Sequence, residues 1–134
     1  MKKILFVCVE NAGRSQMAEA FFRKYAPDKF YASSAGTKPS SKVNPMVVEA
    51  MKEVGINLQD NTPKSLTNEM LSDSVAVNMG CMDKESCPAL FVKDVLDWNI
   101  SDPKGKSISE VRKIRDQIEL KVLELVKKLE EGQN

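Results

Sequence analysis

Short apolar runs along the chain favour β-strands. Residues 3–7 form an unbroken run that, after its lysine, is mostly β-branched or aromatic, as is typical of a fully buried strand. Three further runs of similar character lie at residues 30–33, 75–79 and 95–98. The sequence therefore predicts four strands.

Between and after these runs, apolar residues recur at the spacing of an α-helix. The pattern covers residues 14–25 and stops at a proline. A second helix is expected over residues 44–55, opened by an Asn-Pro pair and closed by a glycine. The last helix is expected from Ser107, which forms a capping box with Glu110, to a closing glycine at position 132.

Strands that alternate with helices predict an α/β fold. We expect a single domain over residues 1–134, with a central four-stranded parallel sheet flanked by helices on both faces. Sheets of this kind bind ligands at the carboxyl ends of their strands. Cys8, Cys81 and Asp102 follow the first, third and fourth predicted strands, so they are expected along one edge of the sheet.

Composition and charge narrow the class of function. The chain has 134 residues, of which 42% are hydrophobic, and a formal net charge of +1. This balance gives no reason to expect binding to nucleic acid or to an acidic membrane. No apolar run is long enough to span a bilayer, and the basic start of the chain lacks the apolar stretch of a signal peptide. We expect a cytoplasmic monomer.

Histidine is absent, which excludes histidine-based acid–base catalysis and the commonest zinc ligand. The three cysteines, Cys8, Cys81 and Cys87, are an odd number in a reducing compartment and do not suggest a disulfide framework. Three thiols alone also make a poor zinc site. We expect no metal and no organic cofactor.

The strongest candidate site is a loop between the first strand and the first helix. It consists of Cys8, Val9, Glu10, Asn11, Ala12, Gly13, Arg14 and Ser15. Unpaired backbone N–H groups of residues 9–14, at the positive end of a helix, would form a cradle for an oxyanion. Arg14 can add two charge-assisted hydrogen bonds, and the same field favours the thiolate of Cys8.

Three other side chains of the loop have expected supporting roles. Ser15 can donate a hydrogen bond to the thiolate, and Gly13 permits a tight turn. Asn11 can tolerate a left-handed conformation or fix the loop through its side chain. The alternative interpretation of the loop is a buried structural cysteine beside a surface arginine.

The pattern Cys8-x-x-Asn11-x-x-Arg14-Ser15 resembles the active-site loop of the low-molecular-weight tyrosine phosphatase superfamily. Within that superfamily, residues 16–19 (Gln-Met-Ala-Glu) and 34–36 (Ser-Ala-Gly) resemble the thioredoxin-coupled arsenate reductases. The resemblance runs through almost the whole chain and implies the parallel α/β fold described above. It also implies that arsenate or phosphate is the substrate oxyanion and that thioredoxin is the electron donor.

The resemblance implies a relay of three thiols. Cys8 attacks arsenate and forms an adduct, and Cys81 then attacks Cys8 and expels arsenite. Cys87 resolves the resulting disulfide, and thioredoxin reduces the Cys81–Cys87 pair. Five residues separate Cys81 from Cys87, where the family leads us to expect six. The alternative is that these are two ordinary cysteines.

The superfamily has its general acid in a late Asp-Pro pair, which implies this role for Asp102. Asp97 is a nearby alternative, and a simple turn is another. Some members hold potassium through four side chains, of which Asn11, Glu19 and Ser34 match. The fourth position is Ser65, so an acidic ligand is missing and potassium is not expected to be required.

Three functions are compatible with these residues. The first is arsenate reduction through Cys8, Cys81 and Cys87, and the second is hydrolysis of phosphotyrosine or aryl phosphates through a Cys8 phosphoenzyme. Lys104-Gly105 after the Asp-Pro pair, in place of aromatic residues, argues against the phosphatase. So does Gly13, which replaces a second loop cysteine. The third is an oxyanion-binding protein without turnover.

Overall fold

The computed structural model describes residues 2–72, 74–80 and 95–132. The strands are β1 (Lys2–Cys8), β2 (Phe30–Gly36), β3 (Ser74–Asn78) and β4 (Val95–Asp97). The helices are α1 (Arg14–Tyr25), α2 (Pro45–Lys52), α3 (Asn68–Leu71) and α4 (Ile108–Glu130).

All four strands pair in parallel, as predicted, and the structure gives their order as β2-β1-β3-β4. The chain leaves β1 for β2 on one side and later returns to β3 on the other side. The strand order therefore reverses at the carboxyl end of β1, and the loop after Cys8 lies at this switch point.

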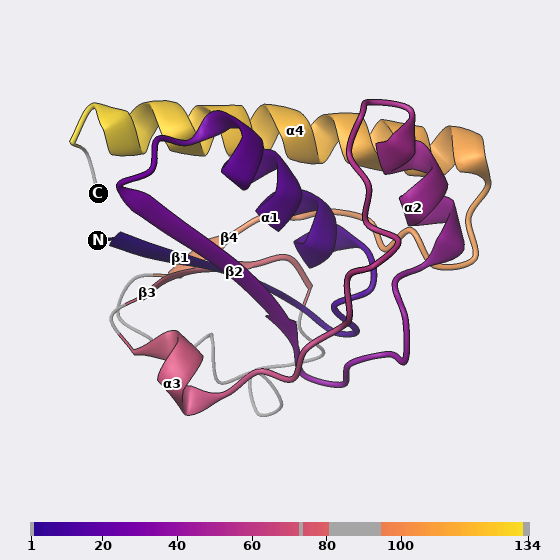
Figure 1. Cartoon of the computed structure of the whole chain (residues 1–134), viewed down its shortest axis with the longest axis horizontal. Helices are drawn as coiled ribbons and strands as arrows, with labels where there is room; N and C mark the ends of the chain where they lie inside the picture. Colours follow the sequence, from indigo (N-terminus) through magenta and orange to yellow (C-terminus); the bar gives the residue numbers. More distant parts are fainter. Residues whose placement is uncertain (1, 73, 81–94, 133–134) are drawn as a thin grey trace.

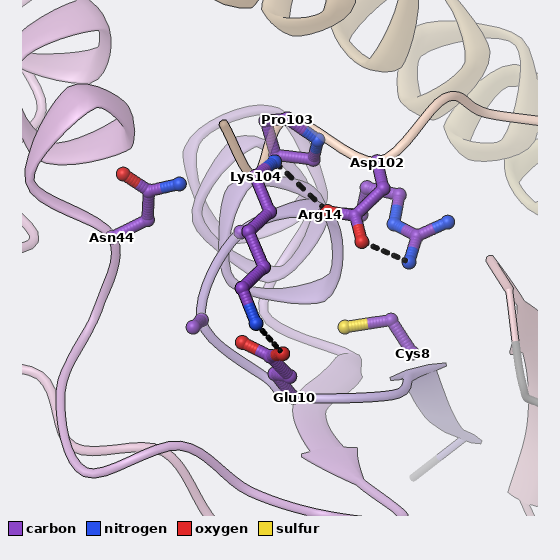
Figure 2. Close-up of a pocket in the computed structure, with 9 residues that line it drawn as sticks. Cys8, Glu10, Arg14, Asn44, Asp102, Pro103 and Lys104 are labelled. Carbon is purple, nitrogen blue, oxygen red and sulfur yellow. Dashed lines mark hydrogen bonds and ion pairs between the residues drawn. The ribbon is translucent and has the colours of Figure 1, made fainter. Parts of the chain in front are cut away.

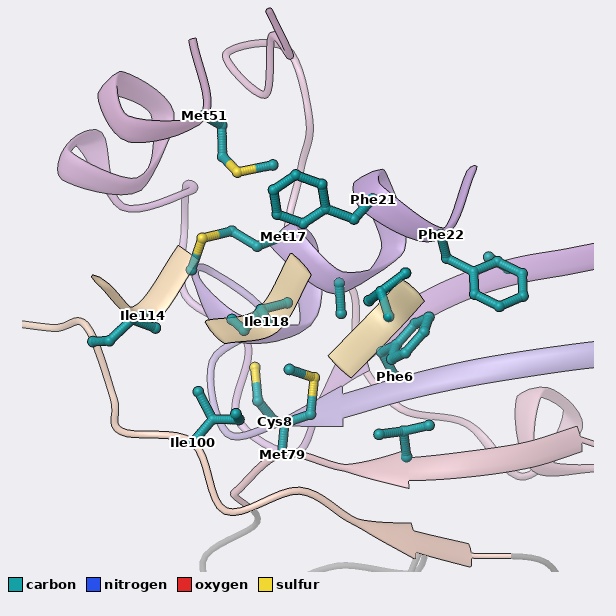
Figure 3. Close-up of a cluster of buried hydrophobic side chains, with 14 of the residues drawn as sticks. Phe6, Cys8, Met17, Phe21, Phe22, Met51, Met79, Ile100, Ile114 and Ile118 are labelled. Carbon is teal, nitrogen blue, oxygen red and sulfur yellow. The ribbon is translucent and has the colours of Figure 1, made fainter. Parts of the chain in front are cut away.

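Among the described residues, different helices cover the two faces of the sheet (Figure 1). Helices α1, α2 and α4 pack on one face, where Phe6 of β1 lies among Phe21, Phe22 and Ile118 (Figure 3). On the other face, Leu5 and Val7 pack with the segment around α3. Because β1 is covered on both sides, residues 4–7 are fully buried, as its unbroken apolar run predicted.

Local signals account for the helix ends. Asn44 caps α2 by accepting a hydrogen bond from the Met46 N–H, and Gly55 closes the following turn with a φ of 83°. The Gly55 and Ile56 N–H groups donate to the carbonyls of Lys52 and Met51, the pattern of a Schellman motif. At the start of α4, Ser107 accepts from the Glu110 N–H, as the capping box predicted.

Two elements differ from the sequence-based expectation. Strand β2 runs on to Gly36, because its last residues continue to pair with β1 as far as Cys8. The short helix α3 was not predicted, since a four-residue turn capped by Thr67 is too short for an apolar period.

In the described part of the chain, no helix is long and apolar enough to cross a membrane.

Candidate active site

The candidate site is a pocket at the switch point of the sheet. Its lining comes from the end of β1 and the loop after it, the starts of α1 and α2, and the segment before α4 (Figure 2). The lining residues are Cys8, Glu10, Ala12, Gly13, Arg14, Asn44, Asp102, Pro103 and Lys104. The structure thus brings Cys8, Arg14 and Asp102 together, whereas Cys81, which was expected on the same edge of the sheet, lies outside the described residues.

Three carbonyl groups of the loop point toward one neighbouring segment, residues 38–44. The carbonyls of Val9, Glu10 and Ala12 accept hydrogen bonds from the N–H groups of residues 38, 40 and 44, at 2.8, 3.0 and 2.8 Å. In a trans peptide, the N–H that follows each carbonyl points the opposite way. These amide groups therefore face away from the 38–44 segment, which is the orientation that an oxyanion cradle needs.

Helix α1 adds further donors at the same place. The other helices in the described residues have side-chain caps, Asn44, Thr67 and Ser107. Helix α1 begins after Gly13 with no side-chain cap and no acidic residue in its first turn. Its first N–H groups and the positive end of its dipole are thus available to an anion.

The sulfur of Cys8 has a defined hydrogen-bond partner. The thiol is 2% exposed, and its Sγ lies 2.8 Å from Ser15 Oγ. The Asn11 side-chain amide donates to the same Ser15 oxygen at 2.7 Å. Because the Ser15 oxygen accepts from Asn11, its hydroxyl hydrogen can point at Cys8 and stabilise a thiolate.

The orientation of Asn11 is fixed by the chain around it. Its Oδ1 accepts from the backbone N–H of Lys64 at 2.8 Å, which leaves Nδ2 as the donor to Ser15. Gln16 also donates to this oxygen, and Asn61 donates in turn to Gln16. Asn11 has a φ of 51° and also holds the loop through its side chain, so it combines the two roles that the sequence offered as alternatives.

Arg14 is buried and held from two sides. Its Nη1 donates to the Ile100 carbonyl at 3.1 Å, and its Nη2 lies 3.7 Å from Asp102 Oδ2. The other oxygen of Asp102 accepts from the Lys104 N–H at 3.0 Å. The half-exposed carboxylate of Asp102 thus borders the pocket beside the guanidinium. Asp97 accepts from Asn78 on the sheet and does not line the pocket.

Three glycines allow other parts of the chain to pack closely against the site. An added Cβ at Gly13 would lie 2.8 Å from Pro103, one at Gly36 would lie 2.6 Å from the Val9 carbonyl oxygen, and one at Gly80 would lie 2.2 Å from Arg14 Nη1. The expectation that Gly13 serves a tight turn was therefore incomplete, because close approach of Pro103 requires it. The roles of Gly36 and Gly80 were missed, since these contacts come from distant parts of the chain.

The residues compared with a potassium site carry their own counter-charges. Glu19 accepts a hydrogen bond from Ser34 at 2.5 Å and pairs with Arg23 at 2.8 Å. The ammonium of Lys64 lies 3.8 Å from the same carboxylate. This set does not fit a bound potassium ion, because side-chain cations already balance the acid and the fourth position is Ser65.

Cys81 and Cys87 lie outside the described residues.

A parallel sheet with a loop from a cysteine to an arginine at its switch point is typical of a class of proteins that use a thiol at an oxyanion-binding site. The family model for low molecular weight phosphotyrosine protein phosphatases matches residues 3–134, and the chain belongs to this family. A protein of Halobacterium salinarum named as a putative arsenate reductase is 40% identical over 129 residues, covering 92% of this chain and 89% of the relative.

Two solved structures show the same fold. A thioredoxin-dependent arsenate reductase from Corynebacterium glutamicum is 36% identical with a TM-score of 0.82, over 99% of this chain. The chain spans 64% of the length of that protein. An arginine phosphatase from Geobacillus stearothermophilus has a TM-score of 0.87 but 26% identity, over 99% of this chain and 96% of the other.

Proposed function

We propose that the chain is an arsenate reductase that works through the thiolate of Cys8 and is regenerated by thioredoxin. The observation that carries the proposal is the cradle around Cys8, with Ser15 on its sulfur and Arg14 paired with Asp102. Arsenate and phosphate share shape and charge, so this cradle suits both. The names of relatives direct the proposal to arsenate, since one at 40% identity is named as a putative arsenate reductase and one at 37% as an arsenate reductase.

In the first step, the Cys8 thiolate attacks the arsenic of arsenate. The amides of residues 9–14 and the guanidinium of Arg14 stabilise the charge on the remaining oxygens. Asp102 protonates the leaving oxygen, which departs as water. The product of this step is a covalent adduct between Cys8 Sγ and arsenic(V).

In the second step, the thiolate of Cys81 attacks Cys8 Sγ and breaks the sulfur–arsenic bond. The electron pair of that bond remains on arsenic, which leaves as arsenite, and a Cys8–Cys81 disulfide forms. Cys87 then attacks Cys81 and frees Cys8. Thioredoxin returns two electrons to the Cys81–Cys87 disulfide. We assign this cycle to a cytoplasmic monomer.

A second candidate is a phosphatase acting through a Cys8 phosphoenzyme. The structural likeness to the arginine phosphatase favours it, because the first step needs the same cradle and the same acid. However, the described pocket has no aromatic residue in its lining to hold a phenol ring. Weak phosphate ester hydrolysis by the reductase is therefore expected and would not contradict the proposal.

The test is NADPH consumption by the reduced protein with thioredoxin, thioredoxin reductase and arsenate. We expect many turnovers per protein, all lost in Cys8→Ser, with slow p-nitrophenyl phosphate hydrolysis lost in the same variant. No arsenate-dependent NADPH consumption beside brisk ester hydrolysis would replace the reductase by the phosphatase. Any turnover in Cys8→Ser would refute Cys8 as the nucleophile.

A further inference from the structure

An ion pair crosses the mouth of the candidate site. Lys104 Nζ lies 2.8 Å from Glu10 Oε2, and both residues line the pocket (Figure 2). Glu10 belongs to the cradle loop, and Lys104 follows the Asp-Pro pair, so the contact joins two segments 94 residues apart. The carboxylate of Glu10 is the main reason that the pKa of Lys104 is raised above its ordinary value.

The anchoring of this pair ties it to the leaving-group side of the site. The backbone N–H of Lys104 donates to Asp102 Oδ1 at 3.0 Å, so the backbone of Lys104 is held next to the proposed general acid. In an in-line attack, the leaving oxygen lies opposite Cys8 Sγ and beside that acid. A group attached to this oxygen would therefore extend toward the rim of the pocket, which Lys104 and Glu10 line.

The space left under the pair is small. The free space in the pocket is small, about 20 Å³, and it is bordered by the cradle loop, Asn44 and residues 102–104. A free oxyanion needs only the cradle itself, whereas an ester needs additional room for its substituent. The described lining has no apolar ring to replace the ion pair as a contact for such a substituent.

We infer that the Glu10–Lys104 pair is a specificity determinant that restricts the cradle to free oxyanions and disfavours their esters. The inference rests on the proposed function in one respect, the placement of the leaving oxygen beside Asp102. The pair also reduces electrostatic repulsion, because Lys104 neutralises the carboxylate of Glu10, which would otherwise repel the incoming anion.

The test measures equilibrium binding of inorganic phosphate and of phenylphosphonate to the reduced protein by calorimetry. In phenylphosphonate, a phenyl group replaces one oxygen of phosphate. For Glu10→Ala and Lys104→Ala, we expect the affinity for phenylphosphonate relative to phosphate to rise by about two- to fivefold, the range for an exposed ion pair. Lys106→Ala removes a lysine two residues away and is the control, with an unchanged ratio.

Two further readouts separate closure of the mouth from a simple change of charge. Phosphate affinity itself should rise in Glu10→Ala, which frees an ammonium, and fall in Lys104→Ala, which leaves a carboxylate uncompensated. The ratio should nevertheless shift in the same direction in both, and Glu10→Ala/Lys104→Ala should match the single variants because the residues act as one unit. Additive shifts, or an unchanged ratio in either single variant, would overturn the inference.

These measurements require no turnover, so they fail independently of the proposed function. A protein that reduces arsenate but shows an unchanged ratio would retain the proposed function and lose this specificity determinant. A protein that shows the expected ratio but consumes no NADPH with arsenate would lose the reductase and retain the determinant. Melting temperatures of the variants confirm that each is folded.

Discussion

At the scale of single residues, the site depends on exact contacts around Arg14. Gly80 has a φ of 120°, and an added methyl group there would lie 2.2 Å from Arg14 Nη1. The end of an arginine side chain can move aside at small steric cost. However, Nη1 also bonds to the Ile100 carbonyl, so movement would displace the guanidinium from the pocket.

We therefore predict that Gly80→Ala weakens phosphate binding by roughly ten- to a hundredfold, the loss of a hydrogen bond to a charged group. The measurement is calorimetric titration of the reduced protein with inorganic phosphate. Gly55→Ala is the matched control, because Gly55 also has a positive φ, of 83°, but no atom lies within 4 Å of the added methyl group. This control should lose stability and keep its affinity, and unchanged affinity in Gly80→Ala would refute the role of Gly80.

The sequence revealed the residues of the site whose signal is local. Cys8, Arg14 and Ser15 lie within one short loop between a buried strand and a helix, and Asn11 is a residue type that tolerates its left-handed conformation. The support from Gln16, Lys64 and Gly80 could not be predicted. It depends on segments that only the folded chain brings beside the loop.

At the scale of elements, the described residues show how α2 is attached to α4. Glu53, at the end of α2, accepts from Arg112 on α4 at 2.7 and 2.9 Å and from Arg115 at 3.0 Å. Arg115 is buried and also donates to the Ala50 carbonyl at 2.8 Å. Since Asn44, which caps α2, lines the pocket, this junction supports one wall of the site.

The hydrogen bond from Arg112, followed by that from Arg115, holds the pKa of Glu53 below its ordinary value. A carboxylate with a lowered pKa in the folded state stabilises the fold above its unfolded pKa, about 4.3, and loses this contribution as the pH falls through the folded value. We predict that Glu53→Gln lowers the melting temperature at neutral pH and that the difference from the parent disappears in acid.

The measurement is thermal unfolding of parent and variant between neutral pH and pH values below the ordinary carboxyl range. Glu124→Gln is the control, because Glu124 is an exposed glutamate of α4 that forms no ion pair among the described residues. A Glu53→Gln deficit that persists undiminished in acid would show that the carboxylate charge is not responsible.

At the scale of the whole molecule, the fold itself explains why the site lies where it does. The reversal of strand order at β1 opens the carboxyl edge of the sheet, and the loop between Cys8 and Arg14 occupies that opening. The alternation of strands and helices was sufficient to predict this architecture. The details that were missed, the last residues of β2 and the short helix α3, have no periodic signal of their own.

The proposed thiol relay can be tested through the amount of arsenite that cysteine variants release, since this amount reports how electrons flow through the whole protein. Cys87→Ser can still form the adduct, and its Cys81 can still attack Cys8 and expel arsenite, so it should release about one arsenite per protein and then stop as a Cys8–Cys81 disulfide. Cys81→Ser lacks the attacking thiol and should release none. Arsenite is quantified after mixing the reduced variants with arsenate, and p-nitrophenyl phosphate hydrolysis, which needs only Cys8, should persist in both. Repeated arsenite release by either variant with thioredoxin present would mean that the electrons reach arsenic by another route.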